Sequence, residues 1–179
     1  KKVLYTIAEL YEEHNKPDEA LNYFKRILVF CPGDIQLQYR IGLLHMRQGR
    51  YSDAINVLES LCTKQRDHID ALYNLGISYE QINDITRAKD TYNKISDLDS
   101  ENAEVLIRLG SLFLNESCFT KAKEYFLKTI ELDKYLLEAN LAMSKIYLSL
   151  DDPESCVVIC NKILECLDLP RTRTIDSLN

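Results

Sequence analysis

A small residue returns every 34 positions along this chain of 179 residues. Four alanines and a cysteine fill these places with no insertion between them: Ala20, Ala54, Ala88, Ala122 and Cys156. The residue four places later is large in the first four copies and is a cysteine in the fifth: Phe24, Leu58, Tyr92, Phe126 and Cys160. A repeat of this length is typical of a chain built from stacked copies of one supersecondary unit.

Residues 69–102 show what one copy of the repeat contains. The apolar and small residues of its first half are three or four positions apart, as on one face of an α-helix: Leu72, Leu75, Gly76 and Tyr79. Asn83 and Asp84 favour a turn, and Thr86 is the expected N-cap of a second helix. The apolar stripe of that helix is Ala88, Tyr92 and Ile95. We therefore expect a helical hairpin whose two helices approach closely at Gly76 and Ala88.

The turn of the hairpin is repeated as well. One position of every copy carries a residue with turn chemistry: Asn15, Gly49, Asn83, Ser117 and Asp151. Most of these residue types tolerate a left-handed backbone, so we expect the same turn in all five copies. With these features the chain resembles the tetratricopeptide repeat family, whose repeat is 34 residues long. It departs from the family pattern at Gln38, His45, Asn140, Cys156 and Cys160.

The resemblance implies an all-α fold, a right-handed superhelix (an α–α solenoid) of ten antiparallel-paired helices. We expect one array over residues 1–170, with units 1–34, 35–68, 69–102, 103–136 and 137–170. Residues 171–179 are expected to be a tail or the start of a truncated following element. Because the first repeat starts at once and Lys1 is not an initiator Met, we expect the sequence to be a piece of a longer chain.

Composition excludes several classes of function. The formal net charge of −6 offers no basic surface for nucleic acid, and no apolar run reaches the length of a membrane span. The six cysteines take different places in the repeat, which argues against a disulfide framework and favours a reducing, cytoplasmic compartment. Cys156 and Cys160 occupy core positions of the repeat. A metal site with Cys166 is disfavoured because a fourth ligand is missing.

The sequence carries no catalytic motif. A glycine-rich phosphate loop, Gly-x-Ser-x-Gly and His-Glu-x-x-His are all absent from a chain with five glycines and three histidines. His45 stands where the repeat has an aromatic residue, so a buried imidazole is expected there. We therefore expect a non-catalytic protein without a cofactor.

In the superhelices of this family the first helix of each unit lines a concave groove. The resemblance gives the middle units an apolar floor at the groove positions: Tyr39, Leu43, Met46, Tyr73, Ile77, Ile107 and Leu114. The expected rim is polar and consists of Arg40, Asn74 and Arg108. A contiguous exposed apolar strip favours a binding site. We expect an interaction module or scaffold that binds a partner helix or extended peptide there, with Arg40 and Arg108 selecting acidic or polar flanks.

Three alternatives stay open. The first is that the groove tyrosines only seal contacts between neighbouring units. The second is self-association into a structural scaffold through the open ends or the groove, since no polar capping helix is visible. The third is a regulatory segment of a larger multidomain protein or enzyme.

Two specialised binding modes of the family do not match this sequence. For the clamp that binds a C-terminal carboxylate, only Asn74 and Arg108 match the family's residues, and Glu104 has the opposite charge to the lysine expected there. The family's asparagine ladder has a single rung, Asn74.

Overall fold

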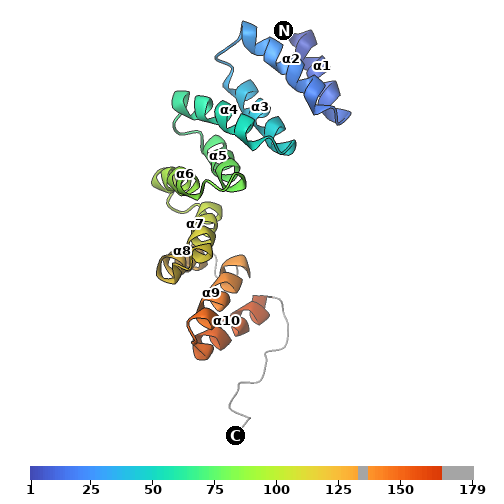
Figure 1. Cartoon of the computed structure of the whole chain (residues 1–179). Helices are drawn as coiled ribbons and strands as arrows, with labels where there is room; N and C mark the ends of the chain where they lie inside the picture. The colour runs from blue at the N-terminus through green and yellow to red at the C-terminus, as the bar shows by residue number, and fades with distance from the viewer. Residues whose placement is uncertain (133–136, 167–179) are drawn as a thin grey trace. The chain divides into compact units, whose positions relative to one another are not determined.

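The computed structural model describes residues 1–132 and 137–166, and every regular element in this part of the chain is an α-helix (Figure 1). Within residues 1–132 and 137–166, ten helices pair into five hairpins, one for each predicted repeat, which confirms the all-α solenoid fold. Their bounds are α1 (Lys2–Glu13), α2 (Pro17–Phe30), α3 (Ile35–Arg47), α4 (Tyr51–Lys64), α5 (Ile69–Gln81), α6 (Ile85–Leu98), α7 (Ala103–Asn115), α8 (Phe119–Leu132), α9 (Leu137–Ser149) and α10 (Pro153–Cys166). The predicted tail, 171–179, lies outside the described residues.

The turn inside each hairpin is left-handed, as the sequence predicts. The five turn residues have positive φ: Asn15 (54°), Gly49 (70°), Asn83 (62°), Ser117 (58°) and Asp151 (55°). In every turn the N–H of the next residue donates to the carbonyl oxygen five residues earlier, at 2.8 to 3.0 Å. This bond closes the end of the first helix and satisfies one of its last carbonyl groups. The repeated turn is therefore confirmed in all five hairpins.

The second helix of the third repeat begins earlier than the sequence suggests. Thr86 lies inside α6, and the cap is Asp84, whose Oδ1 accepts the backbone N–H of Arg87 at 3.2 Å. A carboxylate is favoured here because it accepts an unpaired N–H and lies at the positive end of the helix dipole. Other helices are capped in the same way, by Asp34, Asn102 and Asp152.

The two helices of a hairpin approach closely where the first helix carries glycine. A methyl group at Gly110 would lie 2.9 Å from the Phe126 ring, and one at Gly76 would collide with the Tyr92 ring. The predicted close approach at Gly76 is thus confirmed, but the atoms nearest to it belong to Tyr92 rather than to Ala88. A small residue on the first helix makes room for a large one on the second.

The chain divides into two compact units, which we call the N-terminal half (Lys1–Ile95) and the C-terminal half (Ser96–Asn179). The boundary lies inside α6, so a single array over 1–170 remains a prediction. Each half has its own buried cluster of apolar side chains. In the N-terminal half it includes Phe24, Ile27, Leu37, Ile41 and Leu44. In the C-terminal half it includes Ile107, Phe126, Met143, Ile146 and Ile159.

His45 is buried in the N-terminal half, as expected, with 3% of its surface exposed. Within the described residues its Nδ1 has no hydrogen-bond partner, and Oδ2 of Asp53 lies 3.8 Å away. Burial, and next the charge of Lys25, lower the pKa of His45 below its usual value. The imidazole is therefore neutral near pH 7.

None of the helices in the described part of the chain combines the length and the apolar character needed to cross a membrane.

Candidate functional site

The predicted groove residues of the N-terminal half lie on α3 and α5, two helices in contact with each other. All five floor residues are half-buried: Tyr39, Leu43 and Met46 on α3, and Tyr73 and Ile77 on α5. Each side chain therefore packs partly inside this half and leaves the rest of its surface open to solvent.

Tyr39 joins the second repeat to the third. Its hydroxyl oxygen accepts a hydrogen bond from Nδ2 of Asn74 at 3.0 Å, and its ring centre lies 5.1 Å from that of His68. The same Nδ2 donates to the carbonyl oxygen of Asp70 at 2.8 Å. Burial raises the pKa of Tyr39. For this tyrosine, the contacts favour the alternative that it seals a junction between repeats.

Arg40 is engaged by the first repeat. Its Nε donates to Oε2 of Glu12 at 2.6 Å, and its Nη1 donates to Oε1 of Glu9 at 3.0 Å. The guanidinium also lies 5.0 Å from the centre of the Phe24 ring, within cation–π distance. The Glu12 side chain is only 14% exposed and is also paired with Arg47 at 3.4 Å. Arg40 thus holds α3 to α1, which leaves little of its charge for an acidic partner.

The three predicted site residues of the C-terminal half lie on α7 and differ in their surroundings. Ile107 is 9% exposed and belongs to the buried cluster of this half, so it offers little floor to a partner. Arg108 is half-buried. Leu114 is half-buried too and lines a groove.

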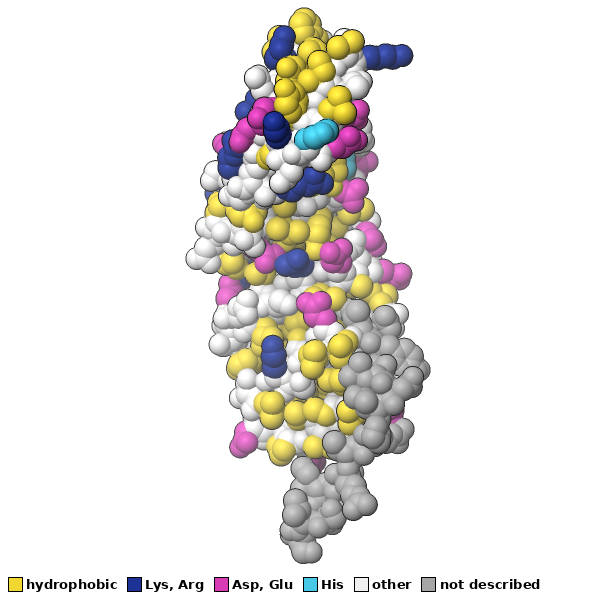
Figure 2. All heavy atoms as spheres, turned by 90° about the vertical axis from the view of Figure 1, so that its right-hand side faces the viewer, with side chains coloured by type: hydrophobic (Ala, Val, Ile, Leu, Met, Phe, Trp, Pro, Cys, Tyr) yellow, Lys and Arg dark blue, Asp and Glu magenta, His cyan; other side chains and the backbone are white. Residues whose placement is uncertain are grey.

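Three leucines on α9 leave a large part of their side chains exposed. The exposed fraction is 38% for Leu137, 44% for Leu141 and 66% for Leu148. Their spacings of four and seven place them on one face of the helix, and Lys145 lies on the same face. Figure 2 shows hydrophobic side chains gathered over α9 with a basic side chain among them. Such an apolar patch rimmed by polar groups is typical of a binding surface.

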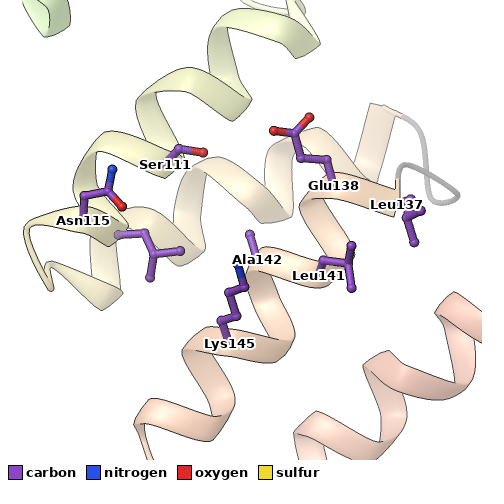
Figure 3. A pocket seen from close by; sticks show the side chains of 8 residues that line it. Ser111, Asn115, Leu137, Glu138, Leu141, Ala142 and Lys145 are labelled. Atoms are coloured by element: carbon purple, nitrogen blue, oxygen red, sulfur yellow. The ribbon is translucent and has the colours of Figure 1, made fainter. Parts of the chain in front are cut away.

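A groove of about 570 Å³ lies between α7 and α9 (Figure 3). Its walls are Ser111, Leu114 and Asn115 from α7, and Leu137, Glu138, Leu141, Ala142 and Lys145 from α9. Figure 3 shows the side chains of Ser111 and Asn115 on one helix across from those of Ala142 and Lys145 on the other. The floor is apolar, while Glu138 and Lys145 bring opposite charges to the rim.

The groove and the exposed face of α9 include residues that the sequence analysis did not select. Leu141 and Lys145 line the groove, and Leu148 lies on the same exposed face of α9. They occupy the fifth, ninth and twelfth positions of the fifth repeat, the same positions that gave the selected residues of the middle repeats. A second signal was that apolar residues lie on all sides of α9. A helix of that kind needs cover on its outward face as well as on its inward face.

The cysteines differ in burial. Cys156 is buried in the core as expected, whereas Cys160 is exposed, so the expectation of a core position is wrong for Cys160. The side chain of Cys166 lies outside the described part of the structure. Among the described residues, no group of three or more His, Cys, Asp and Glu side chains is arranged to hold a metal ion.

Helical hairpins that pack on one another and share a repeated left-handed turn define a helical-repeat protein. Two sequence profiles of the tetratricopeptide repeat match the chain, one at residues 2–33 and the other at residues 45–112. The chain belongs to the tetratricopeptide repeat family.

Several solved structures have a similar fold. MamA protein is 22% identical with a TM-score of 0.84, over 93% of this chain and 91% of that one. A tetratricopeptide repeat protein from Parabacteroides merdae ATCC 43184 is 18% identical with a TM-score of 0.84, over 93% of this chain and 66% of that one. YrrB, a TPR protein with an unusual peptide-binding site, is 18% identical with a TM-score of 0.75, over 92% and 85%. No curated protein sequence matches this chain significantly.

Proposed function

We propose that this protein is a non-catalytic interaction module that binds a partner helix or an extended peptide in the groove between α7 and α9. The observation that supports this most directly is the row of exposed leucines on α9 beside a groove of about 570 Å³. Members of the family generally bind protein or peptide partners. YrrB, one of the proteins of similar structure, is a TPR protein with an unusual peptide-binding site.

Apolar contact supplies the affinity in this proposal. Full burial of a leucine side chain stabilises a complex by roughly 1.5 to 3 kcal/mol relative to exposure. Leu137, Leu141 and Leu148 are 38 to 66% exposed, so a considerable part of that free energy is still available to a partner. A partner with apolar side chains at helical or alternating spacing fits such a row.

Charge at the rim sets the direction of the partner. Glu138 and Lys145 are seven residues apart on α9, which corresponds to about two helical turns or roughly 10 Å along the axis. A partner with a basic residue near Glu138 and an acidic residue near Lys145 would bind in one orientation only. Rim charges of this kind contribute to specificity and association rate more than to affinity.

The N-terminal half contributes a separate apolar surface to the same class of partner. There the half-buried side chains are Leu43, Met46, Tyr73 and Ile77. Arg40 and Tyr39 already form hydrogen bonds within the N-terminal half. We therefore assign this half the smaller part of the binding free energy.

Peptides selected from a random library displayed on phage test this proposal. Affinity for wild type, Leu141→Glu and Leu127→Glu would be measured by fluorescence anisotropy. Leu127 is a matched control, because it is 40% exposed and lies on α8, away from the groove walls. We expect Leu141→Glu to weaken binding about tenfold or more, or roughly 1.4 kcal/mol, and Leu127→Glu to leave it unchanged. Peptides that bind Leu141→Glu as tightly as wild type would contradict the proposal.

A further inference from the structure

The end of α2 carries two neighbouring apolar side chains that are open to solvent. Val29 is 78% exposed and Phe30 is 75% exposed, the two highest values for large hydrophobic residues in the described part of the chain. A single exposed apolar side chain is ordinary on a protein surface, whereas adjacent ones form a patch. We call this pair the α2 ridge.

The exposure of the α2 ridge belongs to its place in the repeat. The second repeat packs against the first through α3 and against the third through α4, and its equivalent residues are Thr63 and Lys64. Both are exposed, so a neighbouring repeat on either side does not cover these positions. The five repeats have Val-Phe, Thr-Lys, Asp-Leu, Glu-Leu and Glu-Cys there. Only the first repeat therefore places two large apolar side chains on this outward surface.

Two cations lie one helical turn before the α2 ridge. Lys25 and Arg26 are exposed and come four positions before Val29 and Phe30, which places all four on one side of α2. The Arg26 guanidinium lies 5.6 Å from the centre of the Tyr23 ring. Within the described residues, neither cation forms an ion pair with a carboxylate. Both positive charges are thus available to a partner.

We propose that this side of α2 binds a segment of a partner protein that carries an apolar side chain and a carboxylate close together. The apolar side chain packs on the α2 ridge, and the carboxylate pairs with Lys25 or Arg26. The cations precede the ridge by roughly 6 Å along the helix axis. Residues i and i+4 of a partner helix, or i and i+2 of an extended segment, span a similar distance. This surface goes beyond the proposed function, because α2 contributes no wall to the groove between α7 and α9.

An anionic membrane matches the same side chains less well. Basic clusters that bind such membranes carry roughly four to eight cations, whereas this side of α2 presents Lys25 and Arg26. The formal net charge of −6 also opposes the approach of the protein to a negative lipid surface. A short acidic peptide needs only one or two cations, so the charge of this surface favours a protein partner.

Selection from a random peptide library displayed on phage tests the proposal, with the full-length Leu141→Glu protein as bait so that the groove on α9 is blocked. Affinities of the selected peptides would be measured by fluorescence anisotropy for this bait and after a further change in it. The changes are Phe30→Ser, the pair Lys25→Glu and Arg26→Glu, and Leu98→Ser. Leu98 is the matched control, because it is the equivalent of Phe30 on α6 and is 51% exposed. All these residues are exposed, so folding should be retained, as circular dichroism would verify.

We expect the selected peptides to share an apolar residue with a Glu or Asp two or four positions away. Phe30→Ser and the double charge reversal should each weaken binding about tenfold or more, and Leu98→Ser should leave it unchanged. Exchange of the acidic residues of the peptide for lysine should restore binding to the charge-reversed protein.

The proposal would be overturned if no selected peptide depended on both Phe30 and the two cations, or if Leu98→Ser weakened binding as much as Phe30→Ser. Vesicles of phosphatidylserine and phosphatidylcholine provide the comparison with a membrane. Binding to these vesicles that is lost in Phe30→Ser, without any peptide that depends on Phe30, would assign the surface to lipid and would equally overturn the proposal.

Discussion

The first helices of the two halves use equivalent repeat positions in different ways. At the fifth position, Tyr39 in the N-terminal half is bonded to Asn74 and packed on His68. Leu141 in the C-terminal half occupies the same position and is 44% exposed beside an open groove. At the sixth position, Arg40 is held by two carboxylates, whereas its equivalent Ala142 is a small wall of that groove.

The difference lies in what these side chains can bond. A tyrosine hydroxyl and a guanidinium find hydrogen-bond partners one repeat away, so they tie neighbouring hairpins together. A leucine side chain cannot form a hydrogen bond, so its exposed surface remains open to an apolar partner. The residue type at such a position therefore decides its role. A polar side chain holds neighbouring repeats together, whereas an apolar side chain stays exposed for a partner.

The largest expected effect on stability follows removal of the Arg40 side chain. Arg40→Ala leaves Glu12, 14% exposed, with Arg47 as its remaining ion-pair partner. We expect a loss of about 1 to 3 kcal/mol in the free energy of unfolding, measured by urea denaturation. Lys145→Ala on the groove of the other half is the matched change and should cost no more than about 0.5 kcal/mol. Equal losses for the two variants would remove the contrast between the halves.

Acidification should weaken the N-terminal half through His45. This residue is buried there, and its burial lowers its pKa from the usual 6.5. The unfolded chain therefore takes up a proton before the folded one does. The contribution of neutral His45 to the free energy of unfolding is fully present above pH 6.5. It is lost as the pH falls from there through the lower pKa of the folded state, by at most about 1.4 kcal/mol per pH unit.

Melting temperatures between about pH 7 and about pH 5.5 would check this expectation, with His45→Phe as the control. Phenylalanine occupies the equivalent position in the fourth repeat, Phe113, and should be accommodated. The control should show a smaller shift than wild type. An equal shift in both proteins would mean that His45 is not the group responsible.

Tyr39→Phe sharpens the comparison by removing a single hydroxyl. Nδ2 of Asn74 then keeps only its bond to the carbonyl oxygen of Asp70. We expect a loss of about 0.5 to 1.5 kcal/mol in chemical denaturation. An unchanged midpoint and slope would show that the bond between the second and third repeats adds nothing to stability.

The smallest effect on stability is expected from the leucines of α9. Leu148→Ser changes a side chain that is 66% exposed and should shift the free energy of unfolding by no more than about 0.5 kcal/mol. The same change should weaken peptide binding, because apolar contact is lost from the row of exposed leucines beside the groove. A clear drop in the melting temperature would instead assign Leu148 a structural role.

The local parts of the fold were predictable because they depend on neighbours in the sequence. Spacings of three and four gave the helices, and the residue types at one repeat position gave the five left-handed turns. The cap of α6 was missed by two residues, since both Asp84 and Thr86 have a suitable side chain and only backbone geometry distinguishes them.

The candidate site was harder to predict because it depends on contacts between repeats. Arg40 pairs with side chains 28 and 31 positions away, and Tyr39 bonds one that is 35 positions away. Whether such pairs form is decided by side-chain conformations after the hairpins stack. Repeat positions could therefore name candidate groove residues, whereas the exposure of residues such as Leu141 became visible only in the structure.

The left-handed turns also bear on the order in which the hairpins open. A left-handed backbone costs an ordinary residue roughly 1 to 2 kcal/mol, glycine almost nothing and asparagine less than most. The N-terminal half meets this demand with Asn15, Gly49 and Asn83, and the C-terminal half with Ser117 and Asp151. Amide hydrogens of α7 to α10 should accordingly exchange with solvent sooner than those of α3 and α4. We therefore expect the half with the open groove to open locally more readily than the N-terminal half.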